Sequence, residues 1–196
     1  MDMIMSMVIE AAAAAAVLVP VLLVCNQLRF HSGRKTLAYC IFCLYLAVMG
    51  ALVGLPSITY IRFGPNVNLI PFAGMGIHTL LNVLLFVPFG FALPCFWQDR
   101  RHLGKVALEG FLLSLLIELL QIFTFRATDI NDLITNTLGA VVGYGLAWGL
   151  ERLCPGFCIK GWDSKDRFLL YGAVLAVMML VQPTIAGALW ELVYYR

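Results

Sequence analysis

The chain has 196 residues, of which 62% are hydrophobic and only 12% are charged, and its mean hydropathy is +0.91. A soluble domain of this length usually carries about twice that share of charged residues, so the composition argues against a soluble globular protein. The formal net charge of +2 excludes little by itself, and the positions of the charges are more informative.

Apolar blocks of about twenty residues, separated by short polar breaks, follow one another along the chain. Each has the length that a helix needs to cross the hydrocarbon core of a bilayer. We therefore predict an all-α fold, a polytopic transmembrane bundle with about six spans, which forms a single domain over residues 1–196. The blocks lie at roughly 4–25, 36–56, 78–96, 104–124, 132–153 and 168–190.

Lys and Arg are concentrated in alternate loops of this bundle. The loops after the first, third and fifth blocks hold ten basic residues: Arg29, Arg34, Lys35, Arg100, Arg101, Lys105, Arg152, Lys160, Lys165 and Arg167. The opposite side holds three, which are Arg62, Arg126 and Arg196. Because short cytoplasmic loops carry the excess of basic residues, we predict that both termini and the loops at 57–77 and 125–131 are extracytoplasmic.

All six cysteines fall in the cytoplasmic half of this topology. Thiols are normally reduced on that side of the membrane. Cys40 and Cys43 have the spacing of a redox motif but lie inside an apolar block, and no His is near Cys154 or Cys158 in the sequence. We predict that the cysteines are packing residues.

Polar residues inside the predicted spans indicate a site, because a charge at the bilayer centre costs about 2.5–3.5 kcal/mol. Ser114, Glu118 and Gln121 are spaced i, i+4, i+7 in the fourth span, so they share one face of the helix. Asn82 in the third span and Asn136 in the fifth lie at a similar depth in the outer half. We predict that these residues converge near the outer face.

The loop between the fourth and fifth spans reads Arg126-Ala127-Thr128-Asp129-Ile130-Asn131-Asp132. It is too short to extend far, so its charges must lie just above Glu118. Asp129 or Asp132 either caps the next helix or belongs to the site, whereas Glu118 lies too deep to be a cap.

Small residues predict where the helices approach each other. Gly139–Gly143 and Gly145–Gly149 both have the small-xxx-small spacing that lets helix backbones come close. In the third span, Pro88 and Gly90 indicate a kink, which either opens space beside Asn82 or adjusts the packing.

An ordered series of motifs covers residues 66–150. The motifs are Asn68-Leu69-Ile70-Pro71-Phe72, Asn82 with Phe86–Gly90, Glu118–Gln121, Arg126 with Asp129–Asp132, and Asn136–Ala140. This series resembles the VanZ-like family, bacterial membrane proteins named for one associated with teicoplanin resistance. The resemblance implies an integral, multi-pass protein of the bacterial cytoplasmic membrane and a link to glycopeptide or lipoglycopeptide antibiotics. It also adds Asn68 to the candidate residues.

The outward polar cluster beside apolar helices favours a protein that binds an amphiphile in the outer leaflet, such as a lipid-linked cell-wall intermediate or a lipoglycopeptide antibiotic. Arg126 would attract a phosphate or carboxylate, and Glu118 would orient the groups around it. We expect membrane lipids as partners, and no nucleic acid, cofactor or metal. The candidate ligand-binding residues are Asn68, Asn82, Glu118, Gln121, Arg126, Asp129, Asp132 and Asn136.

Three other interpretations stay open. The first is a membrane-embedded enzyme that modifies an envelope lipid, with Glu118 as acid or base; the sequence has no nucleophile elbow, phosphate loop or zinc-ligand set, so we lean against it. The second is a small transporter or flippase, which the apolar inner halves of the spans disfavour. The third is a purely structural ion pair between Glu118 and Arg126.

Overall fold

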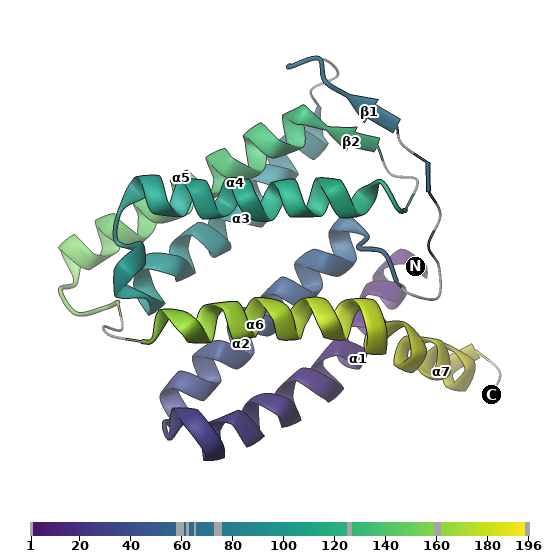
Figure 1. Cartoon of the computed structure of the whole chain (residues 1–196), viewed down its shortest axis with the longest axis horizontal. Coiled ribbons are helices and arrows are strands. Elements are labelled where there is room, and N and C mark those ends of the chain that lie inside the picture. The colour runs from purple at the N-terminus through teal and green to yellow at the C-terminus, as the bar shows by residue number, and fades with distance from the viewer. Residues whose placement is uncertain are drawn as a thin grey trace. The chain divides into compact units, whose positions relative to one another are not determined.

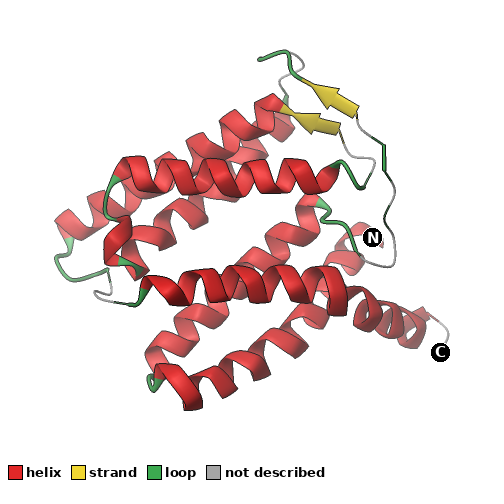
Figure 2. Cartoon of the chain, viewed as in Figure 1, coloured by secondary structure: helices red, strands yellow, loops and turns green. Residues whose placement is uncertain are grey.

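Helices account for almost all of the regular structure (Figure 1, Figure 2). The computed structural model describes residues 2–57, 61, 63–64, 66–72, 76–124, 127–158 and 162–194. The α-helices are α1 (Asp2–Cys25), α2 (Gly33–Val53), α3 (Ile77–Phe96), α4 (Leu103–Gln121), α5 (Ile130–Leu153), α6 (Ser164–Ala176) and α7 (Gln182–Tyr194). The shorter described elements are the helical turns η1 (Asn26–Phe30), η2 (Gln98–Arg100) and η3 (Val177–Val181) and the strands β1 (Asn66–Asn68) and β2 (Ala127–Asp129). The predicted all-α class is confirmed.

The chain divides into two compact units. Unit 1 consists of Met1–Ile61 with Arg167–Arg196, and unit 2 of Arg62–Asp166. Every candidate site residue belongs to unit 2. The prediction of a single domain over residues 1–196 stays a prediction.

Five helical segments are long and apolar enough to cross a membrane: Val8–Phe30, Gly33–Val53, Ile77–Phe96, Ile130–Leu153 and Ser164–Leu192. They coincide with five of the six predicted blocks. The remaining block forms α4, which carries three charged residues, Lys105, Glu109 and Glu118, and is not one of the five. The extracytoplasmic position of the termini stays a prediction.

In unit 1, α1 packs against α2 and α7. A small buried cluster of Ile9, Ala13 and Ala186 joins α1 to α7. The last predicted span is a continuous helical run through α6, η3 and α7, and η3 is a π-helical turn. Pro183 accounts for this wider turn, because its ring would clash with the carbonyl group of Met179 in a regular α-helix.

In unit 2, α5 packs along both α3 and α4 (Figure 1). The residues of α5 that meet α3 include glycines, so no side chain separates the two backbones at these positions. A methyl group on Gly139 would collide with the backbone carbonyl oxygen of Val83, and one on Gly143 with that of Val87. The predicted close approach at Gly139–Gly143 is confirmed.

The structure supports one of the other two predictions about small residues and contradicts the other. Gly90 on α3 faces the backbone carbonyl group of Ala140, which supports the packing interpretation of the segment that also holds Pro88. The predicted contact at Gly145–Gly149 is wrong, since a methyl group built on either residue would meet no described atom within 4 Å beyond its chain neighbours and the nearby backbone of α5 itself. Among the described residues, neither glycine therefore marks a close helix–helix contact.

Gly143→Ala should destabilise the chain by about 1–3 kcal/mol, because the added methyl group must push two helix backbones apart. The matched control is Gly145→Ala, which should be neutral or stabilising by about 0.5–1 kcal/mol because alanine loses less backbone entropy in a helix. Thermal unfolding of the full-length chain in detergent micelles measures both. Equal Tm values for the two variants would contradict the close approach of α3 and α5.

Candidate functional site

Glu118 lies on the buried face of α4, where only 3% of the residue is exposed. Ser114, one turn earlier, and Gln121, at the end of the helix, are also buried. The opposite face carries exposed leucines, namely Leu108, Leu112, Leu116 and Leu119. The predicted polar stripe on one face of this helix is therefore confirmed.

The end of α4 is bound to β2 through Glu118. The backbone N–H of Asp129 donates to the Glu118 carboxylate at 2.9 Å from Oε2. The hydroxyl group of Thr128 donates to the backbone carbonyl oxygen of Glu118 at 3.1 Å, which satisfies one of the carbonyl groups that a helix end leaves without an intrahelical donor. Arg126, the predicted ionic partner of Glu118, lies outside the described residues.

Asp129 is the N-cap of α5. Its Oδ1 accepts the backbone N–H of Asn131 at 2.8 Å, and its Oδ2 accepts the side-chain amide of Asn68 at 3.1 Å. The cap interpretation is thus confirmed for Asp129. Asn68 reaches this carboxylate because β1 and β2 pair in parallel, with Asn68 opposite Asp129 in the register.

Two polar pairs join α5 to its neighbouring helices. The side-chain amide of Asn82 on α3 donates to Asp132 Oδ1 at 2.7 Å, and Asp132 lies in the first turn of α5, where the helix dipole favours negative charge. One turn further on, the amide of Asn136 donates to Ser114 Oγ on α4 at 2.9 Å. Asn136 Oδ1 is buried and has no hydrogen-bond partner among the described residues. The predicted convergence of these helices' polar residues is confirmed.

Asn131 also belongs to the site, although it is not among the candidate residues predicted from the sequence. It is buried, and its Oδ1 accepts the backbone N–H of Phe72 at 2.6 Å. Phe72 has a φ of 65°, a left-handed conformation that costs a non-glycine residue about 1–3 kcal/mol. The hydrogen bond that the Phe72 N–H donates to Asn131 stabilises this conformation. The sequence feature that could have indicated Asn131 as a site residue is its position between Asp129 and Asp132, in the same short loop.

The segment Leu69–Phe72 runs between these anchors and presents apolar side chains outward. Leu69, Ile70 and Phe72 are 68%, 67% and 67% exposed. The backbone N–H of Ile70 donates to Asn68 Oδ1 at 3.2 Å, so hydrogen bonds fix the segment near its start and at its end. An exposed apolar loop is therefore held directly beside the polar network.

Each acidic side chain of the network already accepts a hydrogen bond from a nitrogen donor. Glu118 accepts from the backbone N–H of Asp129 in β2. Asp129 accepts from the backbone N–H of Asn131 and from the side-chain amide of Asn68. Asp132 accepts from the side-chain amide of Asn82. Among the described residues, no group of three or more His, Cys, Asp and Glu side chains could hold a metal ion. The acidic side chains of this arrangement therefore join α4 to β2, β1 to the start of α5, and α3 to α5.

Comparison with known proteins identifies the family of this chain. The family model for VanZ/LLP1 matches residues 36–153, which include every candidate site residue. The chain belongs to the VanZ/LLP1 family. A relative in this family, Protein VanZ of Enterococcus faecium, is 37% identical over 125 residues, which cover 61% of this chain and 72% of the relative. No solved structure matches.

The VanZ/LLP1 match extends beyond the series of motifs that first indicated the family. The motifs lie within residues 66–150, whereas the match begins at residue 36, in the first turn of α2. Most of α2 and all of α3, α4 and α5 therefore belong to the shared region, while α1, α6 and α7 lie outside it.

Substitutions of Glu118 test the contact between α4 and β2. Glu118→Ala should destabilise the chain by about 1–2 kcal/mol, because the Asp129 N–H loses its acceptor. Glu118→Gln keeps an oxygen at the acceptor position and should cost less than half as much. Thermal unfolding in detergent micelles compares the two variants. If the alanine variant unfolds at the Tm of the parent chain, the contact does not contribute to stability and this account of Glu118 is wrong.

Proposed function

We propose that this VanZ-family chain is a multi-pass protein of the bacterial cytoplasmic membrane that binds an amphiphile at the outer leaflet. A lipid-linked cell-wall intermediate and a lipoglycopeptide antibiotic are the two ligand classes with the required chemistry. The observation that carries the proposal is the adjacency of the polar network and the exposed apolar segment Leu69–Phe72. The distribution of basic residues along the chain supports an outer position for this end of unit 2.

The polar part of the ligand would bind at the ends of α3, α4 and α5. Arg126 supplies a positive charge for a phosphate or carboxylate group. Asn136 Oδ1, which lacks a partner among the described residues, supplies an acceptor for a ligand hydroxyl or amide. Glu118 is a positioning residue in this proposal, because its carboxylate accepts the backbone N–H of Asp129, the last residue of β2. Arg126 immediately precedes the first residue of this strand in the sequence.

The apolar part of the ligand would lie against Leu69, Ile70 and Phe72. Covering a large exposed apolar side chain contributes about 1.5–3 kcal/mol. Hydrogen bonds to Asn68 and Asn131 fix the segment before the ligand arrives, so little conformational entropy is lost on binding. A ligand with a polar head and an acyl chain can therefore contact both surfaces at once.

A contribution to teicoplanin resistance follows from this proposal. Teicoplanin carries an acyl chain on a polar glycopeptide, so it has both features that the site would recognise. A chain that retains the acylated antibiotic at the membrane surface would lower the amount that reaches its target.

Substitutions at the two surfaces test the proposal. Teicoplanin binding to the full-length chain in lipid nanodiscs, measured by microscale thermophoresis, should weaken about 10–100-fold in Arg126→Gln, since a hydrogen bond to a charged group contributes about 1.5–3 kcal/mol. Phe72→Ala should weaken binding about 10-fold. A glycopeptide without an acyl chain should respond to the first substitution only.

Matched controls come from unit 1. Arg34→Gln removes an exposed basic residue of α2, and Phe168→Ala removes a phenylalanine that is 65% exposed on α6. Both controls should bind teicoplanin as the parent chain does. Parental affinity in both Arg126→Gln and Phe72→Ala would contradict the proposal.

A membrane-embedded enzyme is the second candidate, and the burial of Glu118 is the observation that favours it. A carboxyl group removed from water can act as an acid or base near neutral pH. Lipid extracts from cells with and without the chain separate the two functions. A new or missing lipid species would favour the enzyme, whereas an unchanged lipid profile together with ligand binding favours the binder.

A further inference from the structure

Two cysteines far apart in the sequence meet at the other end of α3. Cys95 lies next to the last residue of α3 and Cys158 lies in the turn after α5, and their sulfur atoms are 2.7 Å apart. This separation lies between the length of a disulfide bond, about 2.05 Å, and the ordinary contact of nonbonded atoms, about 3.5–4.0 Å. Both residues are buried, and they form a cluster with Ala147.

Hydrogen bonds hold Cys158 in this position. The Glu151 carboxylate, in the last turn of α5, accepts the backbone N–H of Cys158 at 2.9 Å and that of Gly156 at 3.3 Å. Gly156 has a φ of 94°, which a residue with a side chain rarely adopts. The turn therefore folds back onto α5 and places the Cys158 thiol against α3.

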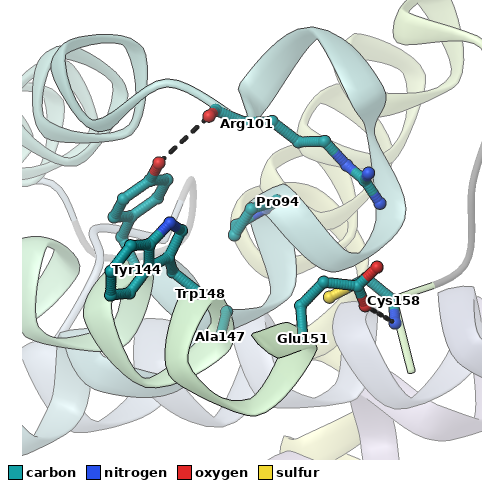
Figure 3. A pocket seen from close by; sticks show the side chains of 7 residues that line it. All are labelled: Pro94, Arg101, Tyr144, Ala147, Trp148, Glu151 and Cys158. Carbon is teal, nitrogen blue, oxygen red and sulfur yellow. Dashed lines mark hydrogen bonds between the residues drawn. The ribbon is translucent and has the colours of Figure 1, made fainter. Parts of the chain in front are cut away.

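A small cavity reaches Cys158. Its volume is about 150 Å³, and Cys158 lines it together with Arg101, Tyr144, Trp148 and Glu151 (Figure 3). The hydroxyl group of Tyr144 donates to the backbone carbonyl oxygen of Arg101 at 3.0 Å across this region (Figure 3). Burial raises the pKa of the Cys158 thiol, so the thiol is protonated at neutral pH and reacts slowly. Only a small, uncharged oxidant suits such a site.

We propose that Cys95 and Cys158 form a reversible redox pair in which a small two-electron oxidant, a peroxide in the cell, joins α3 covalently to the turn after α5. Both S–H bonds break and one S–S bond forms. The two protons and two electrons pass to the oxidant, so that hydrogen peroxide leaves as two molecules of water. A thiol reductant reverses the step by thiol–disulfide exchange. The pair is independent of the proposed ligand site, since Cys95 lies 13 residues from Asn82 along α3, about 20 Å.

The test treats native membranes that contain the full-length chain with an azodicarboxamide, whose N=N bond accepts the two hydrogens. N-ethylmaleimide then blocks the remaining thiols, and peptide mass spectrometry identifies linked cysteines. We expect a linked peptide pair containing Cys95 and Cys158, and its loss after dithiothreitol. When N-ethylmaleimide is added after unfolding in detergent, so that buried thiols are also exposed, the number of thiols that react should fall from six to four.

Substitutions supply the controls. Cys95→Ser and Cys158→Ser should each abolish the linked pair, whereas Cys154→Ser and Cys40→Ser should leave it in place. Cys154 is exposed and lies in the same turn as Cys158, so it is the competing partner. Absence of the Cys95–Cys158 peptide from the oxidised parent chain, or a link from Cys158 to Cys154 in its place, would overturn the proposal. Because the parent chain itself decides the outcome, a variant that fails to fold does not affect the conclusion.

Discussion

The close approach of the α3 and α5 backbones is the constraint on which unit 2 depends. In a lipid environment, helices gain little from hydrophobic burial against each other, so close van der Waals packing must hold them together. Gly139 and Gly143 allow this packing because their missing side chains leave room for the carbonyl groups of Val83 and Val87. The same approach brings Asn82 within hydrogen-bond distance of Asp132.

Asp129 then organises the end of the unit where the polar residues gather. Its carboxylate caps α5 and accepts the Asn68 amide, while its backbone N–H donates to Glu118. One residue thus connects β1, the end of α4 and the start of α5. Asn131 extends these contacts to Phe72, so the apolar segment Leu69–Phe72 is positioned by the same short loop that holds the acidic residues.

The parts of this architecture that depend on local periodicity could be predicted from the sequence. The lengths of the apolar blocks predict the helices, and the spacing of Ser114, Glu118 and Gln121 predicts a buried stripe. Spacing alone did not reveal which face of α5 meets α3, so the Gly145–Gly149 prediction was wrong. Strands of three residues carry too little alternation to be recognised, and β1 and β2 were missed for that reason.

Contacts between distant residues were beyond the reach of the sequence. Phe72 and Asn131 are 59 residues apart, and Cys95 and Cys158 are 63 residues apart. No local pattern links such pairs, and they depend on how three helices pack. The ligand-binding roles of Asn68, Asn82, Glu118, Gln121, Asp129, Asp132 and Asn136 stay predictions, although the structure brings most of them into one hydrogen-bonded region. Arg126 has its proposed role from the sequence alone.

The central claim is that the VanZ-family core binds an amphiphile beside β1 and β2. An experimental structure of the full-length chain in lipid nanodiscs with teicoplanin tests it most directly. The account predicts density for the glycopeptide next to Asn68 and Asp129, with the acyl chain against Leu69–Phe72. Density for the antibiotic only at the Cys158 end of unit 2, or only along the exposed leucines of α4, would contradict it.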